Sequence, residues 1–147
     1  MYKRILVATD GSPLAQKAVD SAIELAALSG AELIALRVVP RYPQSYFEGS
    51  IPLSAEDVAR VEKQWSDDGR STVEAVKAAG EAKGVTVKPI LAKSDIVSDA
   101  LIAAAKKHEA DLIVMASHGR KGVKRLLLGS ETLQVLTHSE TPVLVLR

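Results

Sequence analysis

Residues 5–13 read ILVATDGSP, and this short segment sets a pattern that the rest of the chain repeats. Its first four residues are all aliphatic, which is typical of a strand buried on both faces. Ser12 followed by Pro13 is a helix start signal, with the serine as N-cap and the proline at the first helical position. A buried strand that leads through a short turn into a helix predicts an α/β fold.

Four further apolar runs lie downstream of this segment. Residues 33–39, 112–116 and 143–146 are near-continuous aliphatic blocks, and they predict three more buried strands. The run at residues 85–91 alternates instead and contains Pro89, which cannot donate to a strand ladder, so this strand is expected at a sheet edge. Helical patterns separate the runs, and such alternation predicts a parallel sheet with helices on both faces.

Helical periodicity marks the segments between the expected strands. The first helix is expected to run from the Ser12 cap to Gly30, and the second helix to start at Ser54. Gly69 and Gly80 interrupt the second pattern, and we expect them to weaken that helix. The other two helical patterns cover residues 97–105 and 130–137.

The composition bounds the class of protein. A chain of 147 residues with 47% hydrophobic residues fits one domain with a sizeable core. The formal net charge of +1 gives no global attraction to nucleic acid or to an anionic membrane. The chain has no cysteine, which excludes disulfides, thiolate zinc sites and cysteine nucleophiles. No apolar run approaches the roughly 18 residues of a membrane span, so we expect a soluble, cytoplasmic protein.

One long stretch, from Pro40 to Pro52, has no regular pattern. Its prolines and Gly49 are incompatible with a helix or a strand. A segment of this length could serve as a lid, a partner surface or a mobile connector, and all three alternatives stay open.

Two loops that follow expected strands differ from ordinary connectors. Residues 9–12 follow the first strand, and residues 116–130 join the fourth strand to the last helix. In open α/β sheets, ligands bind at the carboxyl ends of the strands, where the strand order reverses. If the first and fourth strands are neighbours, both loops meet at such a point, and we expect a ligand site there.

The second loop has the components of an anion site. Gly119 and Gly122 allow the backbone to approach a ligand closely. Gly129 and Ser130 open the last helix, which Ser130 is expected to cap and whose free N–H groups suit a phosphate. Asp10, across the cleft, could accept a hydrogen bond from a ribose hydroxyl or an adenine amine, or hold a metal ion. The positive charges of the loop come from Arg120, Lys121, Lys124 and Arg125.

These loop residues resemble a motif of the universal stress protein family, in its nucleotide-binding branch. The family's motif is Gly-x-x-Gly, nine residues, and then Gly-Ser or Gly-Thr. Here residues 116–119 read ASHG, nine residues follow, and Gly129 with Ser130 completes the pattern. The first motif glycine is replaced by Ala116, which would strain the loop if that position needed a positive φ.

The resemblance extends over the whole chain. The opening residues 5–12 and the closing residues 141–145, TPVLV, also match the family. The resemblance implies a single universal stress protein domain over residues 1–147 with a doubly wound, Rossmann-like fold. Its five-stranded parallel sheet is expected to have the order 3-2-1-4-5, with helices on both faces.

The resemblance also assigns nucleotide-binding roles by position. Residues 8–10 would border the adenine and ribose, together with Val38 acting through its backbone. Residues 115–119 would wrap the ribose and the α-phosphate, and the start of the last helix would hold the phosphates. The implied nucleotide-binding residues are Ala8, Thr9, Asp10, Val38, Met115, Ala116, Ser117, His118, Gly119, Arg120, Gly122, Gly129, Ser130, Glu131 and Thr132.

Several of these residues also have a structural explanation. Asp10 could start an Asx-turn before Ser12, and the basic residues of the loop could form a solvated face. His118 is better explained as a surface-loop residue than as a catalytic base. His138 and Glu140 have the spacing of a zinc deaminase motif, but that motif also needs cysteine ligands, which the chain lacks.

The C-terminal strand is expected to form a dimer. Val143 to Leu146 is aliphatic on both faces and reads as buried, yet a terminal strand beyond the switch point lies at a sheet edge. An open apolar edge would aggregate, whereas pairing with a second copy across a twofold axis satisfies the ladder. The family pairs this strand in the same manner, so we expect a homodimer.

The functional expectation follows from a phosphate cradle without an evident nucleophile, general base or metal cage. The resemblance implies a stress-response regulatory protein that binds ATP or another adenine nucleotide. Whether Mg accompanies the nucleotide stays open, and no nucleic-acid or membrane partner is expected. Two alternatives stay open. One is a slow ATP hydrolase that uses the same site with a divalent ion, and the other is a dimeric interaction module whose nucleotide site has decayed.

Overall fold

A computed structural model describes residues 1–41, 54–118 and 128–147 of the chain. Strands and helices alternate along these residues, as the sequence predicts. The elements are β1 (Arg4–Ala8), α1 (Pro13–Ser29), β2 (Glu32–Val39), α2 (Ala55–Glu81), β3 (Val87–Lys93), α3 (Val97–Lys107), β4 (Leu112–Ala116), α4 (Ser130–His138) and β5 (Val143–Leu146).

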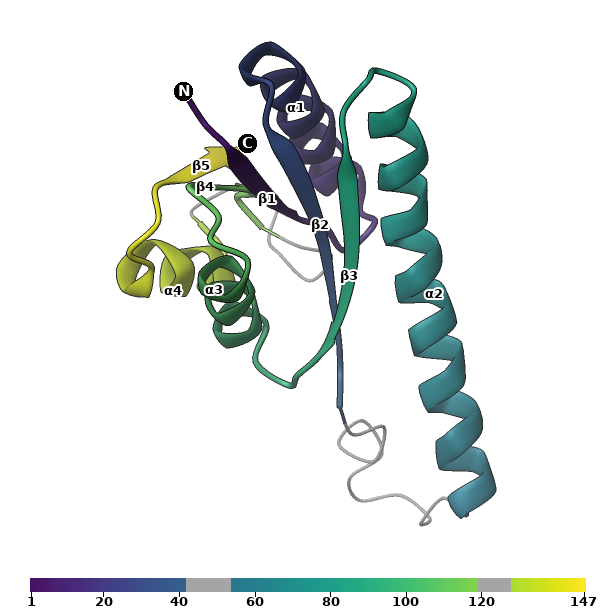
Figure 1. Cartoon of the computed structure of the whole chain (residues 1–147). Helices are drawn as coiled ribbons and strands as arrows, with labels where there is room; N and C mark the ends of the chain where they lie inside the picture. Colours follow the sequence, from purple (N-terminus) through teal and green to yellow (C-terminus); the bar gives the residue numbers. More distant parts are fainter. Residues whose placement is uncertain (42–53, 119–127) are drawn as a thin grey trace.

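The sheet confirms the expected topology. Its five parallel strands have the order β3-β2-β1-β4-β5, with β1 at the centre (Figure 1). Pro89 lies on β3, an edge strand. An edge strand tolerates proline, because no neighbouring strand pairs with its outer side. The chain leaves β1 toward β2 on one side and returns to β4 on the other, so the strand order reverses between β1 and β4.

One apolar layer lies on each face of the sheet. Helices cover both faces, with α1 and α2 on one side and α3 and α4 on the other (Figure 1). Val7 of β1 packs with Val19 of α1 and Val73 of α2 in the first layer. Leu6, its neighbour in sequence, packs with Leu101 of α3 in the second layer. Successive strand residues point to opposite faces, so one strand supplies side chains to both layers. We call these faces the α1/α2 face and the α3/α4 face.

The two glycines of α2 correct a sequence-based expectation. They do not interrupt this 27-residue helix, and both are buried positions of its contact face. A Cβ added at Gly69 would lie 2.5 Å from Cδ1 of Leu91, and one at Gly80 would clash with Val87. The glycines are therefore the places where the helix approaches β3 most closely, and the packing gained there outweighs their low helix propensity.

The helix caps follow local sequence at α1 but not at α4. The Ser12 side chain accepts a hydrogen bond from the N–H of Ala15 at 3.2 Å, and Gly30 ends α1 with a φ of 69°. Both predictions are confirmed. The expected Ser130 cap is wrong, because Ser130 is the first helical residue of α4 and Gly129 is its N-cap, with no side-chain cap bond. The start of α4 is therefore held by contacts from elsewhere in the chain.

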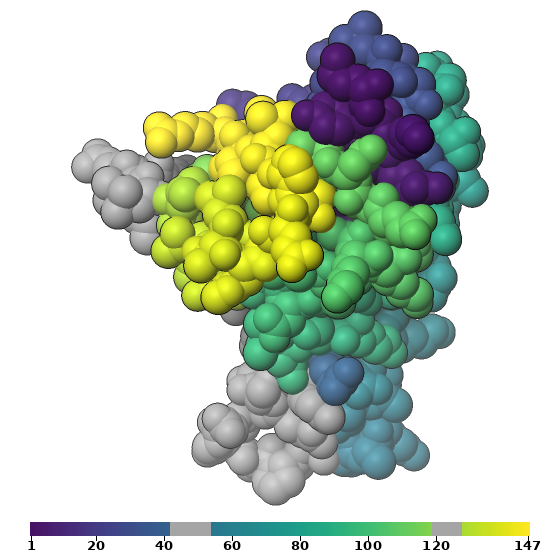
Figure 2. All heavy atoms as spheres, turned by 60° about the vertical axis from the view of Figure 1, so that its left-hand side comes forward, coloured from purple at the N-terminus to yellow at the C-terminus, as the bar shows by residue number. Residues whose placement is uncertain are grey.

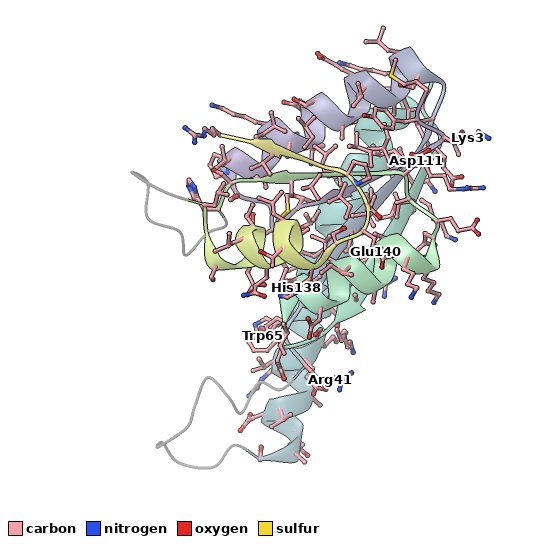
Figure 3. The ribbon with its side chains drawn as sticks, turned by 90° about the vertical axis from the view of Figure 1, so that its left-hand side faces the viewer. Lys3, Arg41, Trp65, Asp111, His138 and Glu140 are labelled. Carbon is pink, nitrogen blue, oxygen red and sulfur yellow. The ribbon has the colours of Figure 1, made fainter. Side chains whose placement is uncertain are left out.

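The ends of the sheet differ in how they are held. At the amino end, the N–H groups of Lys3 and Arg4 donate to the carboxylate of Asp111 at 2.8 and 3.1 Å, which ties β1 to β4 (Figure 3). At the β5 edge, Leu144 is 40% exposed, so this strand is half-buried rather than buried as its sequence suggests. Figure 2 shows β5 and α4, in yellow, together at the surface on the β5 edge of the sheet.

Among the helices of the described residues, none combines the length and the apolar character that a membrane span requires.

Candidate functional site

The carboxyl ends of β1, β2 and β4 bring together residues from three parts of the sequence. Ala8 and Val38 pack against the core of the α3/α4 face, and Met115 belongs to that core. The strands are in register, with Ala8 opposite Leu36 of β2 and Val7 opposite Val114 of β4. The expected binding residues of these three strands therefore share one end and one face of the sheet.

The turn after β1 is built from its own side chains. Asp10 Oδ1 accepts a hydrogen bond from the N–H of Ser12 at 2.9 Å, which is an Asx-turn and confirms that structural explanation. The N–H of Gly11 donates to Oγ1 of Thr9 at 3.1 Å, and Gly11 has a φ of 78°, a left-handed conformation that favours glycine. Both of these side-chain bonds lie within residues 9–12.

Thr9 anchors this turn to the sheet. Its N–H donates to the carbonyl of Leu36 at 3.0 Å, which extends the pairing of β1 and β2 by one residue. The Thr9 side chain is buried and lines a pocket on the α1/α2 face. Thr9 therefore presents its side chain on the face opposite to Met115.

The connection after β4 is pinned by backbone contacts. The N–H of Ser117 donates to the carbonyl of Leu146 at 2.7 Å, and the N–H of Gly129 donates to the carbonyl of Ser117, also at 2.7 Å. The buried hydroxyl of Thr132 donates to the carbonyl of Ala116 at 3.0 Å. These bonds hold the first turn of α4 directly over the end of β4.

Ala116 fits its position without backbone strain. It is the last residue of β4, and Glu109 is the only residue other than glycine with a positive φ among the described residues. Ala116 does not need a positive φ, so alanine in place of the first motif glycine causes no backbone strain here.

Gly129 is required by a close approach rather than by its φ of −61°. A Cβ at this position would lie 3.3 Å from Cβ of His118 and 3.4 Å from the carbonyl oxygen of Ser117. His118 itself is half-buried, and its Nδ1 shares a hydrogen bond with Oγ of Ser117 at 3.3 Å. Gly129 and His118 thus lie in contact although ten residues separate them in the sequence.

Glu131 is expected from the resemblance to lie at the phosphates, but its carboxylate has another partner. Oε2 of Glu131 accepts a hydrogen bond from the N–H of Ser98, in the first turn of α3, at 2.9 Å. Sequence reasoning missed Ser98, because no local signal links residues 33 positions apart. The start of α3 is therefore a neighbour of the start of α4.

Some expected residues cannot be placed. Gly119, Arg120 and Gly122 lie outside the described residues, as do the other basic residues of that loop and most of the stretch from Pro40 to Pro52. In the part of the chain that the structure describes, no group of three or more His, Cys, Asp or Glu side chains could hold a metal ion.

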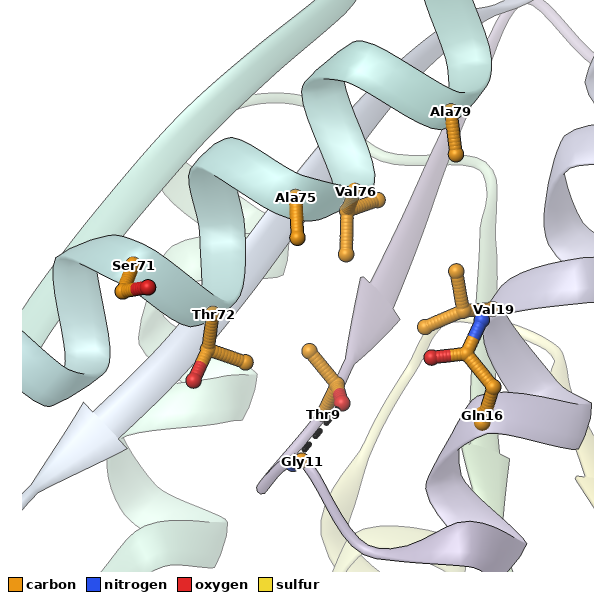
Figure 4. A pocket seen from close by; sticks show the side chains of 9 residues that line it. All are labelled: Thr9, Gly11, Gln16, Val19, Ser71, Thr72, Ala75, Val76 and Ala79. Carbon is orange, nitrogen blue, oxygen red and sulfur yellow. Dashed lines mark hydrogen bonds between the residues drawn. The ribbon is translucent and has the colours of Figure 1, made fainter.

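A separate pocket of about 350 Å³ lies on the opposite face (Figure 4). It opens between α1 and α2, beside the Thr9 side chain, and sequence reasoning did not predict it. The α2 side chains that face it are small, which leaves the space between the two helices unfilled. The lining residues are Thr9, Gly11, Gln16, Val19, Ser71, Thr72, Ala75, Val76 and Ala79.

Comparison with known proteins gives a consistent result. The model of the Universal stress protein family matches residues 1–147. Universal stress protein MJ0531 of Methanocaldococcus jannaschii is 32% identical over 149 residues, which cover 100% of this chain and 83% of that protein. The structure of universal stress protein UspA from Lactobacillus plantarum is similar with a TM-score of 0.83 and 26% identity, covering 99% of this chain and 98% of that one.

A third relative was solved with a ligand. It is a universal stress protein in complex with cAMP, with a TM-score of 0.72 and 26% identity. The similarity covers 99% of this chain and 97% of the relative. Both solved relatives therefore match the fold over nearly their full length.

Proposed function

Because the chain belongs to the universal stress protein family, we propose that it is a stress-response regulatory protein that binds an adenine nucleotide, with ATP as the first candidate. One observation carries the proposal: Ala8, Val38 and Met115, from three strands, share one end and one face of the sheet. Ligands of open α/β sheets bind at such a switch point. The relative in complex with cAMP supports an adenine nucleotide as the ligand class.

The phosphates would lie at the start of α4. By helix geometry, the N–H groups of Ser130, Glu131 and Thr132 have no acceptor inside the helix. These donors and the positive end of the helix dipole favour an anion. Gly129 supports this placement, because its missing side chain lets the first turn of α4 lie close against Ser117 and His118 at the end of β4. Asp10, at the turn after β1, would accept a hydrogen bond from the adenine or ribose.

The proposal is tested by titrating nucleotide-free protein with ATP, ADP, AMP and cAMP in a calorimeter. Gly129→Val should abolish binding, because its side chain would press against His118 and the carbonyl of Ser117 and displace the first turn of α4 from the end of β4. Ala27→Val, an exposed position of α1, is the matched control and should bind as the wild type does. If the wild type gave neither heat nor a thermal shift with any of the four nucleotides, the decayed-site alternative would replace this proposal.

Asp10 offers a test that leaves the turn intact. Asp10→Asn keeps the oxygen that accepts from Ser12 N–H but removes the charge. We expect several-fold weaker binding with an unchanged melting temperature, whereas unchanged affinity would remove Asp10 from the site.

ATP turnover separates a regulatory protein from a hydrolase. A steady-state assay of phosphate release, with and without Mg, should show bound ATP without sustained turnover. Turnover that Gly129→Val abolishes would instead favour the slow hydrolase.

We also propose that β5 pairs with the same strand of a second copy. The carbonyl of Pro142 accepts from Ile113 of β4 and that of Leu146 from Ser117, just after β4, so the alternating residues Val143 and Val145 present their backbone groups at the open edge. The half-exposed Leu144 adds apolar surface that pairing would cover. Light scattering should show a dimer at micromolar concentration. Val145→Pro should give a folded monomer, while the control Val145→Thr should stay dimeric.

A further inference from the structure

The start of α3 is capped by a residue of another helix. Ile96, the N-cap residue of α3, provides no side-chain cap bond. The carboxylate of Glu131 provides that cap, because it accepts the Ser98 N–H at 2.9 Å. A carboxylate near a helix N-terminus is favoured both by the free N–H groups and by the helix dipole. Glu131 therefore stabilises α3 although it belongs to the first turn of α4.

The turn that precedes α3 is also tied to the end of β2. Oδ1 of Asp95 accepts a hydrogen bond from the N–H of Arg41 at 3.0 Å. One residue earlier, the N–H of Ser94 donates to the carbonyl of Val39 at 2.9 Å. Arg41 lies two residues beyond the end of β2 and is labelled in Figure 3. We call residues 94–98 the bridge, because they contact β2 on one side and α4 on the other.

The bridge is internally braced. Oγ of Ser94 accepts from the N–H of Ile96 and also donates to its carbonyl, both at 3.1 Å. Side-chain bonds of this kind fix a turn without help from a helix or a strand. These bonds fix residues 94–96, so the Asp95 contact with Arg41 is joined by a braced turn to the start of α3.

The two anchors of the bridge lie at the two ends of the candidate site. Val38, beside the β2 anchor, would border the adenine and ribose, and the first turn of α4 would hold the phosphates. A Glu131 carboxylate that turned back on its own helix would compete with phosphate for the same N–H groups and repel it. Its hydrogen bond to Ser98 holds the carboxylate on α3 instead.

We infer that Glu131 is a positioning residue that keeps the start of α4 open for phosphate and, through the bridge, couples occupancy of the site to Arg41 at the end of β2. This inference rests on the proposed nucleotide binding for its ligand, but the bridge exists without a ligand. Binding at α4 thus becomes detectable at a backbone group that touches no nucleotide.

The bridge is tested first in nucleotide-free protein, by amide hydrogen exchange measured with NMR. Glu131→Ala should speed exchange of the Ser98 amide by about tenfold and also speed that of Arg41. Glu131→Gln keeps an oxygen acceptor and should preserve slow exchange at both amides. Glu140→Ala, an exposed glutamate just beyond α4, is the matched control. Unchanged exchange of Ser98 in Glu131→Ala would overturn the bridge.

The role in binding is tested next by calorimetry with ATP. Glu131→Ala should weaken ATP binding at least about fivefold, the low end of measured coupling between sites, because the first turn of α4 loses its tie to α3. Glu131→Gln keeps that tie and should bind at least as tightly as the wild type. If both variants bound more tightly, Glu131 would be only a repulsive charge. If both were equally weakened, its charge would act directly on the ligand. Either result would overturn the positioning role.

The coupling to β2 has its own variant. ATP should protect the Arg41 amide in the wild type, and Asp95→Ala should abolish that protection while leaving the Ser98 amide slow to exchange. Protection of Arg41 that survives in Asp95→Ala would overturn the coupling. A wild type that binds no ATP would overturn the proposed function and the coupling together, whereas the bridge is judged by Ser98 exchange alone.

Discussion

The turn after β1 and the connection after β4 sit side by side at the same end of the sheet, yet they are held in opposite ways. In the first, Asp10 bonds to Ser12 and Thr9 to Gly11, each two residues away. In the second, Thr132 reaches back 16 residues to Ala116, and Ser117 bonds to β5. The side-chain bonds of the first turn are therefore local, whereas those of the second form only once β4, β5 and α4 have packed.

This difference bears on how each region can change in evolution or by design. A local turn fails when one of its own residues is replaced, and a conservative replacement restores it. A connection held by distant partners also fails when any of those partners moves. The candidate site combines the local turn with the tertiary connection, and the proposed phosphate position lies at the tertiary connection.

The largest effect is expected at the tertiary connection. Thr132→Val keeps the shape of the side chain but leaves the carbonyl of Ala116 buried without its donor, which should lower the free energy of unfolding by about 1–3 kcal/mol. Urea denaturation followed by circular dichroism measures the change. Thr132→Ser keeps the hydroxyl donor and loses only one methyl group, so it should be less destabilised than Thr132→Val. A Thr132→Val protein as stable as the wild type would show that the connection does not depend on this bond.

A smaller effect is expected in the local turn. Gly11→Ala places a Cβ on a residue with a φ of 78°, which costs about 1–2 kcal/mol. Gly11→Asn should cost less, because asparagine tolerates the left-handed region. The two variants are compared by the same urea titration. Equal losses for alanine and asparagine would mean that the backbone conformation is not the reason for glycine here.

The smallest effect is expected at His108, which follows α3 at the amino end of the sheet, away from both regions. Burial, followed by the nearby charges of Lys88 and Lys107, lowers the pKa of His108, while Glu32 opposes this shift. Below the ordinary histidine pKa of about 6.5, His108 takes up a proton more readily in the unfolded chain than in the folded protein. The free energy of unfolding therefore decreases as the pH is lowered. His108→Gln should flatten the dependence of stability on pH between about pH 7 and pH 5. A slope unchanged by the substitution would contradict this assignment.

Sequence reasoning succeeded wherever the deciding interaction is short-range. The alternation of aliphatic runs and helical patterns determined the α/β class, and Pro89 marked the edge strand. Ser12 and Gly30 bounded α1, because caps act within a few residues. The ends of β1 and β4 were expected to lie together if the two strands are neighbours, and the sheet order shows that they are.

Only the tertiary structure decided the features that depend on a partner distant in the sequence. Gly69 and Gly80 look like interruptions of a helix until Leu91 and Val87 are packed against them. The partner of the Glu131 carboxylate is the N–H of Ser98, which lies 33 positions earlier in the sequence. The physical reason is the same in both cases: propensities and caps act over one turn of backbone, whereas packing and buried hydrogen bonds are set by side chains that only the folded sheet brings together.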